Sequence, residues 1–343
     1  MSGRIKVLIV DDSAIVRKIL SDTLAADPGI EVVGTAPDPI VAQEKIGRLK
    51  PDVLTLDIEM PRMDGLAFLK LLMQTKPLPV IMISSLGQSS SRATLEAMQY
   101  GAVEVIPKPG GPYSVGDLQR DLPLKIRAAA AARLAKGPAL AAPVIRPSNQ
   151  NRTDRAAIIA LGASTGGTEA LRQVLIQMPK DSPPVVAVQH IPAVFSRAFA
   201  ERLDGCCEIQ VKEAADGDEL IWGRALIAPG NFHLHIRRQG AGYRAVVAGG
   251  PLVCYQRPAV DVLFESVAKE AGRHATGALL TGMGSDGAKG LLQMKQAGGR
   301  TIAQDEQTCV VFGMPREAIR LGAAGQVLPL NKIAHALLTP SGN

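Results

Sequence analysis

The feature that most limits how this chain can fold is a regular alternation of short apolar runs and amphipathic stretches over residues 5–108. The predicted strands are 5–10, 30–34, 53–56, 80–83 and 103–106, and the predicted helices lie near 13–26, 38–48, 64–75, 89–100 and 114–134. The strand runs are rich in Val, Ile and Leu, as parallel strands buried on both faces require. The pattern therefore predicts a five-stranded, doubly wound parallel α/β domain.

A second alternation begins at Ala156, after a stretch from Lys136 to about Arg155 that is rich in Ala, Pro, Ser and Asn and lacks periodicity. Its predicted strands are 157–162, 184–189, 225–228 and 276–281, and its predicted helices are 167–177, 195–203, 259–271 and 287–297. We therefore expect a first domain over residues 4–125, a linker over 126–153, and a second, Rossmann-like parallel-sheet domain over 154–343.

Composition narrows the function classes. Apolar residues make up 46% of the 343 residues, so two packed cores can form, although aromatic residues contribute only 3%. The net charge is +6, but the basic residues are scattered, so we expect no nucleic-acid partner. The four cysteines form no Cys-x-x-Cys pair, and no apolar run is long enough for a signal peptide or a membrane span. We expect a soluble, cytoplasmic protein.

Carboxylates follow two strands of the first domain. Asp11 and Asp12 come after the first strand and Asp57 after the third. Because the carboxyl ends of parallel strands share one edge of a sheet, we expect these three acids to lie close together. Three neighbouring carboxylates repel one another, and Mg²⁺ suits such an all-oxygen site. Capping of a helix by Asp12 would explain one of these acids, but not the whole set.

Two further polar residues end the remaining strands at the same edge: Ser84 and Lys108. Their hydroxyl and ammonium groups are suited to bind the oxygens of a phosphoryl group on Asp57. This set resembles the response-regulator receiver family over about residues 4–125. The resemblance implies that Asp57 is the phosphoacceptor and that Asp11, Asp12, Asp57 and the Glu59 backbone carbonyl surround Mg²⁺. The chain departs from the family at Val105, where an aromatic switch residue is common.

The second domain carries a serine in a glycine-rich turn. Ser164 lies in Gly-Ala-Ser-Thr-Gly-Gly (162–167), between a predicted strand and a predicted helix. Glycines allow a tight turn with the serine at its apex, and amide groups at the following helix start can stabilise an oxyanion. A glycine-rich turn with a helix-capping serine is the plainer interpretation of this motif alone.

A base and an acid follow later strands of the same domain. His190 ends the next strand, and Asp286 lies in Thr-Gly-Met-Gly-Ser-Asp-Gly (281–287) after another. Together with Ser164 they form a candidate catalytic triad, in which a buried carboxylate holds the imidazole. We expect backbone donors near Thr165 and Met283 to receive the oxyanion.

Other interpretations of these motifs are weaker. The G-x-S-x-G at 162–166 suggests an α/β-hydrolase, but that fold has the order Ser, acid, His. The G-x-G-x-x-G at 282–287, with Asp305 and Glu306 downstream, suggests dinucleotide binding, but Asp286 would confront the pyrophosphate. His233 and His235 share one face of a probable strand and lack a third metal ligand, so we expect them at the surface or in a cleft.

The combination of a receiver, a linker, Gly-Ala-Ser-Thr-Gly-Gly, Gln-His-Ile-Pro and Thr-Gly-Met-Gly-Ser-Asp-Gly resembles the chemotaxis protein-glutamate methylesterases. The resemblance implies a phosphorylation-activated serine hydrolase that demethylates chemoreceptor glutamates during chemotactic adaptation and deamidates glutamines. It implies a histidine kinase as phosphodonor, Mg²⁺ in the receiver alone, no cofactor for the esterase reaction, and membrane association only through receptors. The alternative is a response regulator whose output domain is a non-catalytic binding module.

Overall fold

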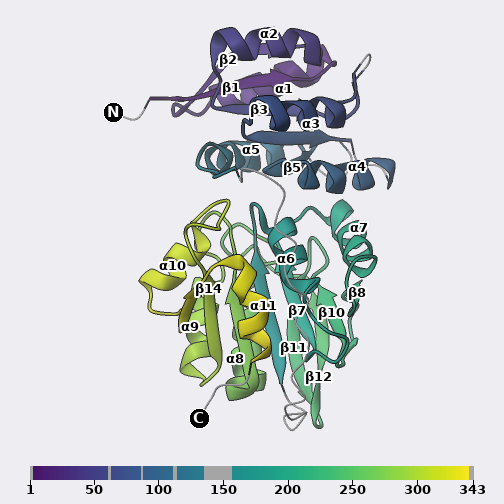
Figure 1. Cartoon of the computed structure of the whole chain (residues 1–343), viewed down its shortest axis with the longest axis vertical. Coiled ribbons are helices and arrows are strands. Elements are labelled where there is room, and N and C mark those ends of the chain that lie inside the picture. Colours follow the sequence, from purple (N-terminus) through teal and green to yellow (C-terminus); the bar gives the residue numbers. More distant parts are fainter. Residues whose placement is uncertain (1–2, 61–62, 86–87, 111–113, 135–156, 340–343) are drawn as a thin grey trace. The chain divides into compact units, whose positions relative to one another are not determined.

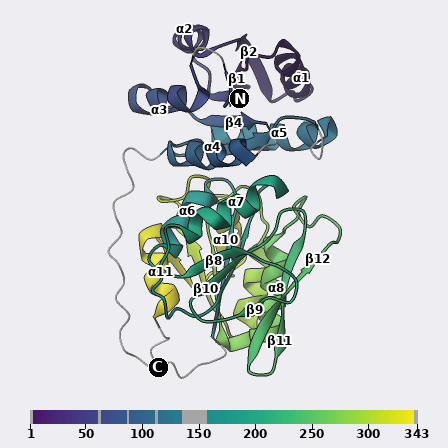
Figure 2. The same cartoon turned by 90° about the vertical axis from the view of Figure 1, so that its right-hand side faces the viewer.

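The computed structural model describes residues 3–60, 63–85, 88–110, 114–134 and 157–339. The chain divides into two compact units, Met1–Lys136 and Gly137–Asn343, coloured purple to blue and teal to yellow in Figures 1 and 2. Most of the predicted linker, residues 135–153, lies outside the described residues. Among the described helices, none has the length and apolar character needed to cross a lipid bilayer.

The first unit is the predicted five-stranded parallel sheet, with the strand order β2-β1-β3-β4-β5. Its elements are β1 (Ile5–Val10), α1 (Ala14–Ala25), β2 (Ile30–Ala36), α2 (Pro39–Leu49), β3 (Val53–Asp57), α3 (Gly65–Thr75), β4 (Val80–Ser84), α4 (Gln88–Gln99), β5 (Glu104–Pro107) and α5 (Val115–Ala130). Strands β3, β4 and β5 are buried along their whole length, as their apolar sequences require. Helix α5 continues five residues past position 125, where we expected the domain to end.

The second unit contains a seven-stranded parallel sheet with the order β15-β14-β13-β6-β7-β10-β8. Its strands are β6 (Ile158–Ala163), β7 (Val185–Gln189), β8 (Gln210–Glu213), β10 (Arg224–Ile227), β13 (Ala275–Leu279), β14 (Arg300–Gln304) and β15 (Gln326–Leu328). Its helices are α6 (Gly167–Leu175), α7 (Ala193–Asp204), α8 (Val260–Ala271), α9 (Ala288–Gln296), α10 (Met314–Arg320) and α11 (Leu330–Leu338). Helix α6 packs against α11, whereas α8 packs against α9, so helices cover both faces (Figure 1). The expected doubly wound fold is confirmed.

A small antiparallel sheet in the second unit was not predicted from the sequence. It joins β11 (His233–Gln239), β12 (Gly242–Ala248) and β9 (Glu219–Leu220) and packs beside α8. Strands β8, β14 and β15 and helices α10 and α11 were also missed. Strand β15 has three residues, and β8 is a largely polar strand at the sheet edge, so neither has the apolar run that identifies a buried strand.

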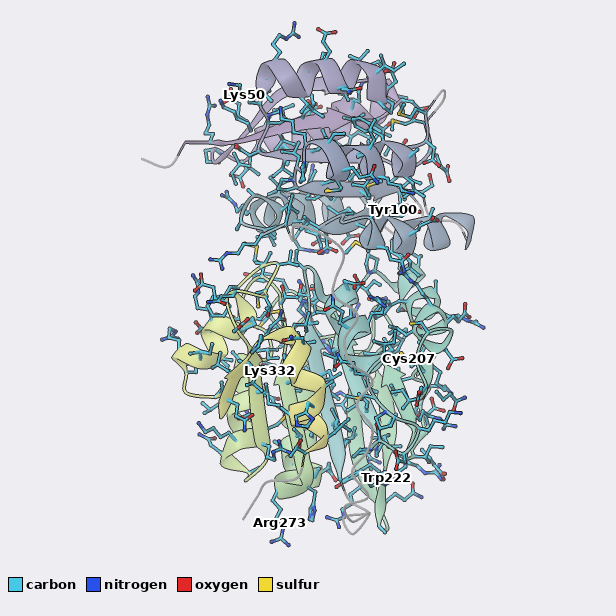
Figure 3. All side chains as sticks on the ribbon, in the orientation of Figure 1. Lys50, Tyr100, Cys207, Trp222, Arg273 and Lys332 are labelled. Carbon is cyan, nitrogen blue, oxygen red and sulfur yellow. The ribbon has the colours of Figure 1, made fainter. Side chains whose placement is uncertain are left out.

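The sheet of the second unit changes its winding direction between β6 and β13. From β6 the chain proceeds to β7 on one side, and from β13 it proceeds through β14 to β15 on the other. Such a switch point opens a crevice at the carboxyl ends of the strands, where ligands bind in open α/β sheets. Trp222 and Arg273, which precede β10 and β13, both lie toward the end of this unit at which these strands begin (Figure 3). The candidate active site is therefore expected at the edge away from these two residues.

Candidate active site and acidic pocket

Ser164 lies in a tight turn directly after β6, and helix α6 begins three residues later. Gly166 has a φ of +76°, and a Cβ there would lie 2.6 Å from the Cβ of Val310, so only glycine fits the turn. The Ser164 carbonyl accepts hydrogen bonds from the Gly167 amide at 2.6 Å and from Gln189 Nε2 at 2.9 Å. The backbone of the serine is thus held from both sides at the carboxyl edge of the sheet, where β6 ends.

His190 and Asp286 form a buried pair at the same edge. His190 follows β7, Asp286 precedes α9, and His190 Nε2 lies 2.7 Å from Asp286 Oδ2. The two residues are 5% and 2% exposed, so this contact is shielded from water. Within the part of the chain that the structure describes, neither His190 Nδ1 nor Ser164 Oγ makes a hydrogen bond. Since Asp286 accepts from Nε2–H, the lone pair of the imidazole is on Nδ1.

The Asp286 carboxylate is fixed by the first turn of α8. The Val260 amide donates to Oδ2 at 2.7 Å, and the Asp261 amide donates to Oδ1 at 2.9 Å. Burial by itself would raise the pKa of Asp286, but the hydrogen bond and charge of His190 and these two amides outweigh burial and lower it. Asp286 is therefore an ionised, oriented acceptor, which is the state that the acid of a catalytic triad requires.

The loop that carries Asp286 also borders the serine. A Cβ on Gly282 would lie 2.2 Å from Met314 Sδ and 2.7 Å from Ser164 Cβ, so the backbone here approaches Ser164 as closely as a glycine allows. Thr281 Oγ1 donates to the Thr165 carbonyl at 3.0 Å and ties the serine turn to this loop. Thr165 is buried, and Met283, directly after Gly282, is half-buried. Both residues predicted to lie near the oxyanion are thus on segments that adjoin Ser164.

Two residues of this site were not identified from the sequence. Gln189 joins the segments of the serine and the histidine, because its Nε2 donates to the carbonyls of Ser164 and of His190. A buried amide side chain at the end of the apolar run Val-Val-Ala-Val (185–188) is a signal that could have identified it. Asp261 is a second buried carboxylate beside Asp286, in the first turn of α8, and its sequence context gives no such signal.

We expected the two histidines on β11 at the surface or in a cleft; His235 is half-buried, whereas His233 does not lie at the surface. His233 is buried; its Nδ1 accepts from the Ala259 amide at 3.3 Å, and its Nε2 lies 2.9 Å from the Pro251 carbonyl. The surface interpretation was therefore wrong for His233, because the missed sheet and the segment before α8 cover it. Both ring nitrogens are engaged, so His233 has none left for a metal.

In the first unit, the predicted residues converge at the carboxyl edge of the sheet. Lys108 Nζ lies 2.7 Å from Asp57 Oδ2 and 3.3 Å from Asp11 Oδ2. Asp11, Asp12 and Asp57 each have one carboxylate oxygen within 4.8 Å of an oxygen of both other residues. A Cβ on Gly65 would lie 1.9 Å from the Asp57 carbonyl oxygen, so the close return of the chain after β3 requires glycine.

The electrostatics of this pocket favour an added cation. Burial raises the pKa of Asp57 to about 6, the Lys108 hydrogen bond opposes this shift, and the charge of Asp11 adds to it. Burial also raises the pKa of Asp11, against the charge of Lys108. Asp11 Oδ2 is buried, and apart from the Lys108 ion pair it accepts no hydrogen bond from the described residues. An oxygen-rich site with an unsatisfied carboxylate oxygen fits a hard divalent cation such as Mg²⁺.

The remaining receiver-like residues occupy the positions that the sequence suggests. Ser84 is buried at the end of β4, where its hydroxyl accepts a hydrogen bond from Thr94 Oγ1 at 3.2 Å. Glu59 is exposed, and its amide donates to Asp57 Oδ1 at 3.3 Å. Val105 is buried in β5. A Val side chain has one χ angle and few rotamers, so it cannot swing as a ring would.

Comparison with known protein families gives two matches that together span most of the chain. Residues 7–116 match the response regulator receiver domain, and residues 159–337 match the CheB methylesterase. The second match alone covers more than half of the chain.

Full-length relatives and one solved structure agree with these matches. The chain is 56% identical to protein-glutamate methylesterase/protein-glutamine glutaminase 2 of Syntrophus aciditrophicus, over 98% of this chain and 99% of the relative. It is 52% identical to the enzyme of the same name from Pseudomonas aeruginosa, over 97% and 96% of the two chains. The crystal structure of the Thermotoga maritima CheB methylesterase catalytic domain matches 53% of this chain and 97% of its own, with 42% identity and a TM-score of 0.52.

Proposed function

This chain belongs to the CheB methylesterase family, the receiver-containing protein-glutamate methylesterases and protein-glutamine glutaminases, and we propose that Ser164, His190 and Asp286 carry out its hydrolysis. The observation that carries this proposal is the buried 2.7 Å contact between His190 and Asp286 at the strand edge that also presents Ser164. The alternative of a non-catalytic binding module has no support among the relatives, which bear the names of enzymes.

The reaction follows from the roles that the geometry allows. His190 Nδ1 takes the proton of Ser164 Oγ, which attacks the carbonyl carbon of the glutamyl ester. Asp286 holds the imidazole through Nε2 and stabilises the imidazolium that forms. The imidazolium then protonates the leaving methoxide, and methanol departs from an acyl-enzyme. Water activated by His190 releases the carboxylate and regenerates the serine. An amide follows the same route, with ammonia as the leaving group.

The oxyanion of the tetrahedral intermediate needs donors close to Ser164. We assign the backbone amides at Thr165 and Met283 to this role, because they lie on the two segments that adjoin the serine. Thr165 directly follows Ser164, and Met283 directly follows Gly282, where an added Cβ would lie 2.7 Å from Ser164 Cβ. Donors fixed by the backbone need no reorganisation during the reaction, and loss of one such donor costs about 10²–10³-fold in kcat.

Phosphorylation control is assigned to the first unit. The phosphoryl group is placed on Asp57, and Lys108 and Ser84 bind its oxygens from β5 and β4. Asp11, Asp12, Asp57 and the Glu59 backbone carbonyl would hold Mg²⁺, which supplies positive charge against the carboxylates and the phosphoryl oxygens. Val105 has no ring whose rotamer could carry the signal, so we propose that the phosphoryl group pulls Ser84 and Lys108 toward Asp57 and alters the adjacent surface. The hydrolase residues need no cofactor.

The substrates and partners follow from the family. Methyl-accepting chemoreceptors are the proposed substrates, a chemotaxis histidine kinase is the proposed phosphodonor, and the cytoplasm is the proposed location. The decisive experiment measures methanol released from methylated receptor membranes by the purified full-length protein. Methanol in proportion to the enzyme supports the proposal, and ammonia from receptors that carry glutamine supports the second activity. Release no faster than from membranes alone would contradict it.

A further inference from the structure

The two helices that flank the catalytic acid exchange hydrogen bonds through two aspartates. Asp286, just before α9, accepts from the first amides of α8, as described above. In return Asp261, in the first turn of α8, accepts from the Gly290 amide in the first turn of α9 at 2.8 Å. Each carboxylate thus binds amides at the start of the other helix, where backbone donors have no partner within their own helix. Asp261 is therefore part of the frame that holds Asp286.

Asp261 is a buried carboxylate next to a second buried carboxylate. It is 4% exposed, and its carboxylate and that of Asp286 offer oxygens within 4.8 Å of each other. Burial raises the pKa of Asp261 to about 6; the amides of Gly290 and Gly287 lower it, and the charge of Asp286 raises it further. Whether or not the acid is ionised, its oxygen accepts from the Gly290 amide, so its part in the frame depends on an acceptor of this length and not on its charge.

Helices α8 and α9 pack so closely that side chains larger than glycine do not fit at two positions between them. A Cβ on Gly290 would lie 2.6 Å from Phe264 Cβ and 2.9 Å from the Asp261 carbonyl oxygen. A Cβ on Gly287 would lie 2.6 Å from Val260 Cγ1. Glycines at both positions let the start of α9 rest on the first turns of α8. Because Asp286 directly precedes this contact, any shift of α9 moves its carboxylate relative to His190.

We propose that Asp261 is a positioning residue of the hydrolase, which fixes the Asp286 carboxylate against His190 by binding the first turn of α9. This inference rests on the proposed roles of Ser164, His190 and Asp286. Asp261 does not touch the imidazole and acts only through Asp286. Its loss leaves the nucleophile in place and weakens the base, so kcat falls while KM for the receptor stays the same. Displacements of this kind cost up to about 10²-fold in rate.

The test uses full-length protein and labelling of Ser164 by a fluorophosphonate, followed by intact mass and peptide mapping. Asp261→Ala is expected to lower the second-order rate constant of labelling by about 10–100-fold, with one label per protein at completion. Asp261→Ser also has a side chain too short to reach the Gly290 amide. It serves as the test if Asp261→Ala does not accumulate as folded protein. Asp261→Asn keeps an acceptor of the same length and is expected to restore the rate constant to within about threefold of the wild type.

A matched control lies one helical turn along α8. Glu265 is exposed, carries the same charge and contacts α9 through Gln293 Nε2 at 3.3 Å, so Glu265→Gln should label at the wild-type rate. Wild-type rate constants in both Asp261→Ala and Asp261→Ser would overturn the proposal. So would a lower final stoichiometry with an unchanged rate constant, because that result describes unfolding of a fraction of the protein. Absence of label on Ser164 in the wild type would instead overturn the proposed nucleophile itself.

Discussion

His190 presents Nε2, not Nδ1, to Asp286, with 2.7 Å between the nitrogen and Oδ2. This orientation leaves Nδ1 as the basic nitrogen and reverses the assignment in the chymotrypsin-type triad, where the carboxylate holds Nδ1. The chemistry is unaffected, because either ring nitrogen can act as the base once the other is held as a donor. In the proposed mechanism, this arrangement makes the reactivity of Ser164 depend on one carboxylate and on the helix that fixes it.

Asp286→Asn should lower kcat for receptor demethylation by about 10²–10⁴-fold, less than the loss on removing the serine. The Asn oxygen can accept from only one of the two α8 amides, because its NH₂ group replaces the other acceptor. The neutral side chain also cannot stabilise the imidazolium, and it favours the wrong tautomer of His190. Methanol release at saturating substrate measures this loss. Wild-type turnover in Asp286→Asn would remove the residue from the mechanism.

Gly282→Ala should reduce activity by at least about 10²-fold, because the new methyl group meets Ser164 Cβ and Met314 Sδ. Overpacking of this kind also costs about 1–3 kcal/mol in the free energy of unfolding. Gly249→Ala, in the same unit, is the control: its φ lies outside the positive region that disfavours side chains, and nothing lies within 4 Å of the added Cβ. The control should therefore stay within about threefold of wild-type activity. Equal losses in the two variants would argue against the close approach of Gly282 to the serine.

Asp57→Asn should abolish acid-labile phosphate and the activation that depends on it, while basal esterase activity stays unchanged. The reason is that Asp57 is the acid at the end of β3, within 2.7 Å of Lys108. Incubation with a small phosphodonor and Mg²⁺, followed by the esterase assay, measures both quantities; activation of about 5–150-fold is expected in the wild type. Asp22→Asn, an exposed aspartate on α1, is the control. Undiminished phosphate in Asp57→Asn would place the acceptor elsewhere.

The pKa of Asp57 gives a pH dependence of stability. Because burial raises it from 3.8 to about 6, the folded state favours the protonated acid. The stability that this preference supplies is fully present below about pH 4 and is lost as the pH rises through about 6. Without Mg²⁺, Asp57→Asn should therefore raise the unfolding free energy of the first unit by about 1–3 kcal/mol at pH 7.5 and by little at pH 4. Hydrogen exchange of the β1 and β3 amides measures the difference, and an equal gain at both pH values would contradict this account.

The sequence was sufficient to predict the parallel strands that carry the candidate site residues, and the residues at their ends. Ser164, His190 and Asp57 each directly follow or end an apolar run. Because the carboxyl ends of parallel strands share one edge of a sheet, these positions predicted where the candidate triad and the acidic pocket would lie. The orientation of the His190 ring and the amides that hold Asp286 could not be predicted, because they depend on where α8 begins in space. Local sequence patterns do not show which distant segments of the chain contact one another.

The antiparallel sheet is a second feature that local sequence patterns could not predict. Residues on β12 alternate between buried and half-buried, and β9 has two residues, so neither resembles the buried runs that identified the parallel strands. Missing this sheet led to the wrong position for His233, which lies beneath the segment that leads into α8. The role of Asp261 was hidden for a related reason, since its partner Gly290 is 29 residues away.

The central claim is that Ser164 is the nucleophile, and methanol release from methylated receptors by Ser164→Ala tests it most directly. Ser285→Ala is the matched control, because this serine is exposed, directly precedes Asp286 and follows a different strand. The account predicts a loss of about 10⁴–10⁶-fold in kcat for Ser164→Ala and near-wild-type turnover for Ser285→Ala. Retention of even a tenth of wild-type turnover by Ser164→Ala, or a comparable loss in Ser285→Ala alone, would contradict it.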